Sequence, residues 1–161
     1  MDQQEASGTP ITPLVSPDLY IIRELSWIEF NRRVFDESKK ARHPLLERVK
    51  FTSIFETNLD EFIMIRLAGL KDQIDSQKSL LSPDGRTAEQ QLTAVRQQLA
   101  PLVQEVRQYW RKELVPSLVQ EHIYVLDYEE LNEAQRDAMR DYFEEEVFPV
   151  LTPLAVDTGH P

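Results

Sequence analysis

The chain has 161 residues, 41% of them apolar, and a formal net charge of −10 at pH 7. This length suits one domain, or one domain and part of another, and the apolar share is sufficient for a core. The absence of cysteine excludes disulfides and thiolate metal sites. No segment reaches the roughly 20 apolar residues that a membrane span needs, so we expect no transmembrane segment and a cytoplasmic protein.

The negative charge is concentrated near the C-terminus. Residues 1–120 carry 17 acidic and 16 basic side chains, whereas residues 121–161 carry 11 acidic and 2 basic ones. A nucleic-acid-binding surface requires a basic patch or stripe. The charge pattern therefore argues against a nucleic-acid partner.

The first helix is predicted after an N-terminal arm. Residues 1–18 are polar and rich in proline, serine and threonine, without the basic and apolar regions of a signal peptide, so we expect a disordered arm. Ser26 and Glu29 have the spacing of a capping box and predict the start of a helix that ends at Lys39 or Lys40. Its apolar face is expected to contain Trp27, Phe30, Val34 and Phe35.

A long helical pattern of apolar residues follows, from Leu45 to Ile74. It predicts either one helix or two helices that meet near Thr57 and Asn58. Asn58 lies in the apolar stripe, and a buried amide needs hydrogen-bond partners. Two explanations stay open: Asn58 caps a second helix, with Glu61 completing a capping box, or a ligand supplies the partner.

The next helix has clear local signals. The sequence Ser-Pro-Asp-Gly at residues 82–85 predicts a turn. Thr87 and Gln90 predict a second capping box. Pro101 lies inside the apolar stripe of the helix that follows and is expected to kink it. Pro116 is expected to mark the end of this helix.

The character of the chain changes after residue 120. Residues 122–128 are β-branched and aromatic and predict a strand. Asn132 predicts the cap of a helix that extends to about Val147, and residues 148–156 predict an extended segment broken by prolines. Strand, helix and extended segment together predict the start of an α+β domain. We expect this domain to be incomplete, because the chain ends before a sheet could close.

Four separated motifs carry a family resemblance: RELSWIEFNRRV (23–34), PLLERVKF (44–51), TNLDEFIMIRLAGL (57–70) and FPVLTPLAVDTGHP (148–161). In this order they resemble the N-terminal part of the long bacterial polyphosphate kinase. The resemblance implies a mainly α structure. An antiparallel helical bundle is expected at residues 19–120, followed by the incomplete, truncated start of an α+β head domain at residues 121–161.

The resemblance also implies an activity. Enzymes of this family reversibly transfer the γ-phosphate of ATP to inorganic polyphosphate, with Mg²⁺, through a phosphohistidine in C-terminal domains. His43, His122 and His160 match no nucleophile position. We therefore expect no catalytic residue, no metal ligand and no tightly bound cofactor in this chain, and no activity of the chain alone. The implied partners are ATP and polyphosphate through the complete enzyme, its own C-terminal domains, and further copies in a homo-oligomer.

One site residue can be carried over from the family. The asparagine of its NLDEF motif contacts adenine, and in this chain that residue is Asn58. Arg32, Arg33 and Arg66 could face phosphates, or pair with the neighbouring acidic side chains. The alternative to a nucleotide-binding role is a helical module for protein–protein interaction or dimerisation, without a ligand, whose motifs are packing surfaces.

Overall fold

The structure is a computed structural model that describes residues 16–77 and 81–153. Most of the predicted arm at residues 1–18, the last part of the predicted extended segment and His160 lie outside the described residues. The chain divides into two compact units, Met1–His122 and Ile123–Pro161.

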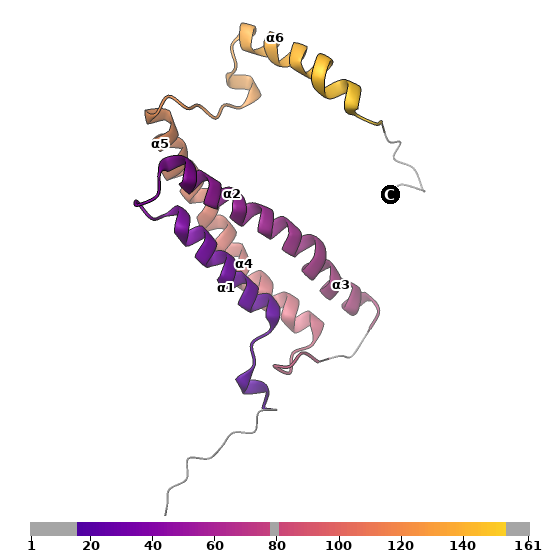
Figure 1. The fold of residues 1–161 in the computed structure, drawn as a ribbon. Helices are drawn as coiled ribbons and strands as arrows, with labels where there is room; N and C mark the ends of the chain where they lie inside the picture. The colour runs from indigo at the N-terminus through magenta and orange to yellow at the C-terminus, as the bar shows by residue number, and fades with distance from the viewer. Residues whose placement is uncertain (1–15, 78–80, 154–161) are drawn as a thin grey trace, which may run out of the picture. The chain divides into compact units, whose positions relative to one another are not determined.

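The described residues of the first unit form three long helical segments. After a 3₁₀ turn, η1 (Pro17–Leu19), the first segment is α1 (Arg23–Ser38). The second joins α2 (Leu45–Glu61), the π-helical η2 (Phe62–Leu67) and α3 (Ala68–Asp75), and the third joins α4 (Ala88–Tyr109), the π-helical η3 (Trp110–Leu114) and α5 (Val115–Gln120). α1 packs against α2 and α4, and α3 packs against α4 (Figure 1). Successive segments run in opposite directions, which confirms the predicted antiparallel helical bundle.

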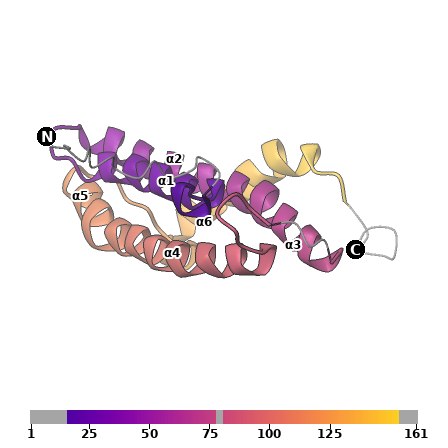
Figure 2. The same ribbon diagram turned by 90° about the horizontal axis from the view of Figure 1, so that it is seen from below.

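The hydrophobic core lies between α1, α2 and α4. Figure 2, which shows the molecule turned by 90°, also shows these three helices side by side. Phe35 and Phe55 are completely buried at its centre, with ring centroids 5.8 Å apart. Burial of such side chains contributes about 1.5–3 kcal/mol each. The buried apolar cluster comprises Ile22, Leu25, Ile28, Phe35, Phe55, Leu59, Phe62, Val95, Leu99, Leu102 and Val106.

The start of α1 differs from the prediction. The helix begins at Arg23, with the extended Ile22 as its N-cap residue, so the predicted capping box at Ser26 is wrong. Ile22 and Leu25 are buried, and their contacts extend the helix beyond the local polar signal. The predicted face is also shifted: Phe30 is 49% exposed, whereas the polar Asn31 is completely buried.

The segment from α2 to α3 is continuous. Asn58 lies inside α2, and Pro44 is the N-cap residue of that helix, so of the two predicted alternatives the one with two helices that meet at Asn58 is wrong. The π-helical turns of η2 come directly after α2, and insertions of this kind change which side chains face the core. Phe62 is buried, whereas Ile63, Met64 and Ile65 are exposed.

The third segment confirms its predicted start but not its predicted end. Gly85 has φ +79°, as the turn requires, and the Thr87 hydroxyl and the Gln90 side chain complete a capping box. α4 continues as a helix through Pro101, which is exposed, so the turn that lacks its hydrogen bond faces water. Pro116 does not end the helix, because the π-helical η3 leads directly into α5 and the segment continues through Pro116 to Gln120.

The second unit contains η4 (Tyr128–Glu130), α6 (Glu133–Tyr142), the π-helical η5 (Phe143–Val147) and η6 (Phe148–Val150). Asn132 caps α6 as predicted. The strand predicted at residues 122–128 is absent, and residues 16–77 and 81–153 contain no strand. A strand needs a hydrogen-bonded neighbour, and no described segment provides one. No side chain of residues 123–153 is buried.

None of the helices in the described residues is sufficiently long and apolar to cross a bilayer.

Candidate functional site

Asn58 and Asn31 form a hydrogen-bonded pair between α2 and α1. Asn58 Nδ2 donates to Asn31 Oδ1 at 3.0 Å, and Asn31 Nδ2 donates to the backbone carbonyl of Phe55 at 3.0 Å. We call these two hydrogen bonds the amide relay. Asn31 is 0% exposed, and Asn58 is partly buried. The amide that interrupts the apolar stripe of α2 thus finds one of its partners inside the fold.

Asn58 also lines a pocket of about 240 Å³. The pocket lies where the middle of α1 faces the end of α2 and η2. The rings of Trp27 and Phe62 stack at its wall, with centroids 4.0 Å apart and an interplanar angle of 6°. The complete lining is Trp27, Phe30, Asn58, Glu61, Phe62, Ile65 and Arg66. The pocket therefore combines flat apolar rings with a few polar groups, which is typical of small-molecule sites.

The amide oxygen of Asn58 has no hydrogen-bond partner among residues 16–77 and 81–153. This oxygen is also not completely buried. The oxygen is consequently accessible from outside the fold. Since the amide nitrogen donates to Asn31, the oxygen is the acceptor that the Asn58 side chain has left for a ligand.

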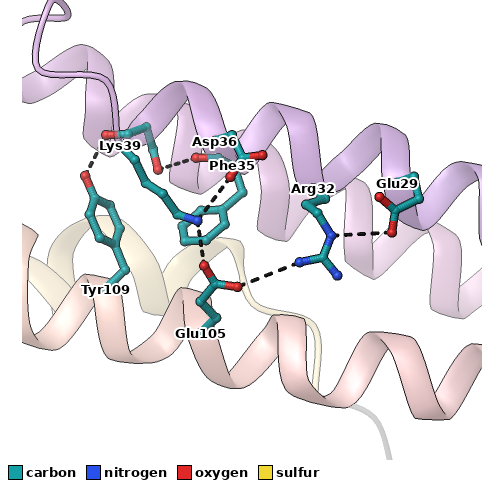
Figure 3. A network of polar contacts seen from close by, with 8 residues as sticks. Glu29, Arg32, Phe35, Asp36, Lys39, Glu105 and Tyr109 are labelled. Atoms are coloured by element: carbon teal, nitrogen blue, oxygen red, sulfur yellow. Dashed lines mark hydrogen bonds and ion pairs between the residues drawn. The ribbon is translucent and has the colours of Figure 1, made fainter.

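The far end of α1 is held against α4 by a polar network (Figure 3). Lys39 Nζ lies 2.6 Å from Glu105 Oε1 and 3.1 Å from Asp36 Oδ1, and 4.1 Å from the centre of the Phe35 ring. Burial lowers the pKa of Lys39, but the hydrogen bonds to Glu105 and Asp36 outweigh it and raise the pKa above 10.5. This network fixes the helix that carries Asn31.

The arginines divide into two groups. Arg32 lies 3.4 Å from Glu29 and 3.8 Å from Glu105, which confirms the interpretation of this residue as paired with neighbouring acids. Arg66 is exposed at the pocket and forms no ion pair with a described side chain. Arg33 is exposed but does not line the pocket, so among these three arginines only Arg66 is placed to meet a charged group that extends from the pocket.

His43 belongs to a charged cluster around Glu37. His43 Nε2 lies 3.0 Å from Glu37 Oε2, and Lys40 and Arg42 contact the same carboxylate. These hydrogen bonds, from Lys40 first and then His43, lower the pKa of Glu37 to about 2. No three acidic or histidine side chains in the described part of the chain converge to hold a metal ion.

Asn31 is the site residue that the sequence interpretation missed. Its signal was present, because Asn31 is three residues after Ile28 and four before Phe35, both of which are completely buried. The same pattern, a polar residue in an apolar helical stripe, thus occurs at Asn31 as well as at Asn58. Trp27 packs against the core as predicted and also lines the pocket, whereas Phe30 lines the pocket and is exposed.

The fold and the pocket define an antiparallel helical domain with a small, partly aromatic site beside an asparagine. Residues 20–126 match the family described as Polyphosphate kinase N-terminal domain. This match covers more than half of the chain, and the chain belongs to that family.

Individual relatives are similar over nearly the whole chain. The chain is 49% identical to the polyphosphate kinase of Thermosynechococcus vestitus over 148 residues, 92% of this chain and 20% of that protein. It is 47% identical to the enzyme of Parasynechococcus marenigrum over 148 residues, 92% of this chain and 21% of that protein. It is 45% identical to the enzyme of Mycobacterium marinum over 150 residues, 93% of this chain and 20% of that protein. The chain thus spans about a fifth of the length of these relatives.

Proposed function

We propose that the chain is the N-terminal region of a polyphosphate kinase that reversibly transfers the γ-phosphate of ATP to inorganic polyphosphate. Membership of the family and the names of the relatives support this proposal. In this enzyme the region supplies an adenine contact through Asn58 and a docking surface for the C-terminal domains. ATP enters as its Mg²⁺ complex, and the protein works in the cytoplasm as a homo-oligomer.

The pocket beside Asn58 is the observation that carries the adenine contact. Its volume of about 240 Å³ is below the roughly 300–1,000 Å³ of pockets that enclose a drug-sized ligand. A pocket of this size suits a single purine base, with the sugar and the phosphates outside. Trp27 and Phe62 offer an apolar wall to the base, and the exposed Arg66 offers a positive charge at the rim.

The amide of Asn58 supplies the polar contact. Its oxygen is accessible and accepts hydrogen bonds, and the 6-amino group of adenine donates them. One such contact, without a cradle for the phosphates, supports only weak binding, with a Kd of about 1 mM or higher. The chain alone is therefore expected to bind ATP weakly and to form no polyphosphate, because the nucleophile and the phosphate-binding groups belong to the C-terminal domains.

Amide-proton NMR titration of the 161-residue chain with MgATP tests the contact. We expect saturable shifts around Asn58 that disappear in Asn58→Ala and persist in Asn132→Ala. The latter removes the same side chain from the cap of α6. Shifts that persist in Asn58→Ala would contradict the adenine contact. Formation of polyphosphate from ATP by the purified chain would contradict the proposed division of labour.

A second candidate function is a helical interaction module without a ligand. Its support is the run Ile63, Met64 and Ile65 in η2, which are 44%, 70% and 59% exposed. Sedimentation equilibrium of the chain and of Met64→Glu distinguishes the two candidates. Self-association that Met64→Glu abolishes, together with no shifts on addition of MgATP, would favour the interaction module.

A further inference from the structure

We propose that Asn31 is a positioning residue that fixes the orientation of the Asn58 amide, so that the site selects 6-amino purines over 6-oxo purines. The inference rests on the proposed adenine contact and adds to it the residue that determines which base fits. It follows from the amide relay and from the burial of Asn31.

The orientation of both amides follows from a backbone carbonyl. The carbonyl oxygen of Phe55 can only accept a hydrogen bond, so the Asn31 group that lies 3.0 Å from it must be the NH₂. The Asn31 oxygen then faces Asn58 and can also only accept. The Asn58 group at 3.0 Å from that oxygen must therefore be its NH₂. The oxygen of Asn58 is left for the pocket.

Burial of Asn31 prevents the opposite orientation. If the Asn58 amide turned over, its oxygen would face the Asn31 oxygen, and two acceptors would meet without a hydrogen atom between them. Asn31 is 0% exposed, so water has no access to replace the lost donor. The polar side chains Glu61 and Arg66 at the pocket are exposed and can adjust to a ligand. Asn58 is thus the polar group of the pocket whose direction the fold determines.

The oriented amide oxygen of Asn58 distinguishes purines with an amino group at position 6 from purines with an oxo group there. The amino group of adenine donates to it, whereas the oxo group of guanine or hypoxanthine presents a second acceptor. Without Asn31, the Asn58 amide could rotate and donate to an oxo group instead. The wild-type site should therefore prefer ATP, and a site without Asn31 should lose much of that preference.

Polyphosphate synthesis by the full-length kinase that contains this region provides the test. Initial rates are measured with MgATP and with MgITP, which replaces the 6-amino group by an oxo group without the 2-amino group of guanine. We expect the ratio of kcat/KM for ATP to that for ITP to fall about tenfold in Asn31→Ala, mainly through KM. Asn31→Leu, which fills the volume but lacks both hydrogen bonds, should give the same result if Asn31→Ala does not fold.

Two further variants separate positioning from a merely structural effect. Asn31→Asp in its neutral form, which burial favours, keeps an acceptor opposite the Asn58 NH₂ and can donate its O–H to the Phe55 carbonyl, so it should retain the wild-type ratio. Val106→Ala creates a cavity on the core face of α4 but removes neither hydrogen bond of the relay, and it should also retain the ratio. Retention by these two variants and loss in Asn31→Ala would support the positioning role.

The possible failures are distinguishable. If Asn58→Ala raises KM for ATP but Asn31→Ala and Asn31→Leu keep the wild-type ratio, Asn58 contacts the base and the positioning role of Asn31 is wrong. If Asn58→Ala changes neither KM nor the ratio, the adenine contact itself is wrong, and the inference is overturned with it. A wild-type enzyme that uses ATP and ITP equally well would also overturn the inference.

Discussion

The hydroxyl group of Tyr109 donates a hydrogen bond of 2.6 Å to the backbone carbonyl of Ser38, which lies 71 positions earlier in the chain. Ser38 is the last residue of α1, where carbonyl groups lack a partner within the helix. Arg48 of α2 donates to the same carbonyl at 2.9 Å and to the Tyr109 hydroxyl at 2.6 Å. One helix end is thus satisfied by side chains from the two other segments of the bundle.

We expect Tyr109→Phe to destabilise the first unit by about 1–2 kcal/mol. The substitution keeps the ring, which contacts Phe35 edge-on with centroids 5.5 Å apart, and removes only the hydroxyl, so a partly buried carbonyl and Arg48 each lose a partner. Urea unfolding followed by circular dichroism measures the change. Tyr128→Phe, at an exposed position of the second unit, is the matched control. Equal stability of Tyr109→Phe and wild type would contradict this role.

Thr87→Ala should destabilise the third helical segment by about 1 kcal/mol. The Thr87 hydroxyl accepts from the Gln90 backbone at 3.3 Å, and the Gln90 side chain accepts from the Thr87 backbone at 2.9 Å. Thr93→Ala is the control, because Thr93 lies within α4 and its hydroxyl contacts only the Glu89 carbonyl. That change should stay within about 0.5 kcal/mol. Thermal unfolding of both variants measures the two changes in stability. Equal destabilisation by Thr87→Ala and Thr93→Ala would argue against a stabilising role of the capping box.

Glu56→Gln should stabilise the protein at pH 7. Burial raises the pKa of Glu56 above 4.5, the charge of Arg107 opposes this rise, and the charge of Asp60 adds to it. Because the pKa of Glu56 is higher in the folded than in the unfolded protein, the protonated Glu56 side chain favours folding below pH 4.5. This contribution to stability is lost as the pH rises through the pKa of Glu56 in the folded protein. After solvent screening we expect a gain below about 1 kcal/mol.

The pH dependence provides the check on Glu56. Urea unfolding at pH 7 should show the gain of Glu56→Gln, and unfolding at pH 4 should show a smaller one. Glu113→Gln, at an exposed position of η3, should change stability at neither pH. A loss of stability in Glu56→Gln at pH 7 would mean that attraction to Arg107 outweighs burial.

Glu37 should titrate near pH 2 in the folded protein, because Lys40, His43 and Arg42 bind its carboxylate. A folded-state pKa below the ordinary value of 4.5 means that this cluster stabilises the fold above pH 4.5. That contribution is lost as the pH falls toward 2. In Lys40→Met the pKa of Glu37 should move up toward 4.5. The carboxyl ¹³C shift of Glu37 as a function of pH measures both values, and a wild-type midpoint near 4.5 would exclude the cluster.

The features predicted correctly from the sequence depend on neighbours within a few residues. The capping boxes at Thr87 and Asn132 close through side chains three positions away, and the turn before α4 needs Gly85 for its positive φ. The helical periodicity predicted a mainly α bundle, because it reports which faces can be buried together. Four motifs in order were sufficient for the family.

The features predicted wrongly depend on contacts between distant segments. Burial of Ile22 and Leu25 starts α1 three residues before its local polar signal. The capping pattern at Asn58 is overridden, since α2 continues through it and packs against α1. Residues 122–128 have the composition of a strand, but a strand forms only against a hydrogen-bonded neighbour.

The sequence by itself determined the family, the helical class and the residue at which a base contact was expected. Only the tertiary structure decided what surrounds that residue. Asn31 and Asn58 are 27 positions apart, and nothing local requires their amides to meet. They meet because the apolar faces of α1 and α2 are buried against each other, and an amide inside such an interface must find its partner across it.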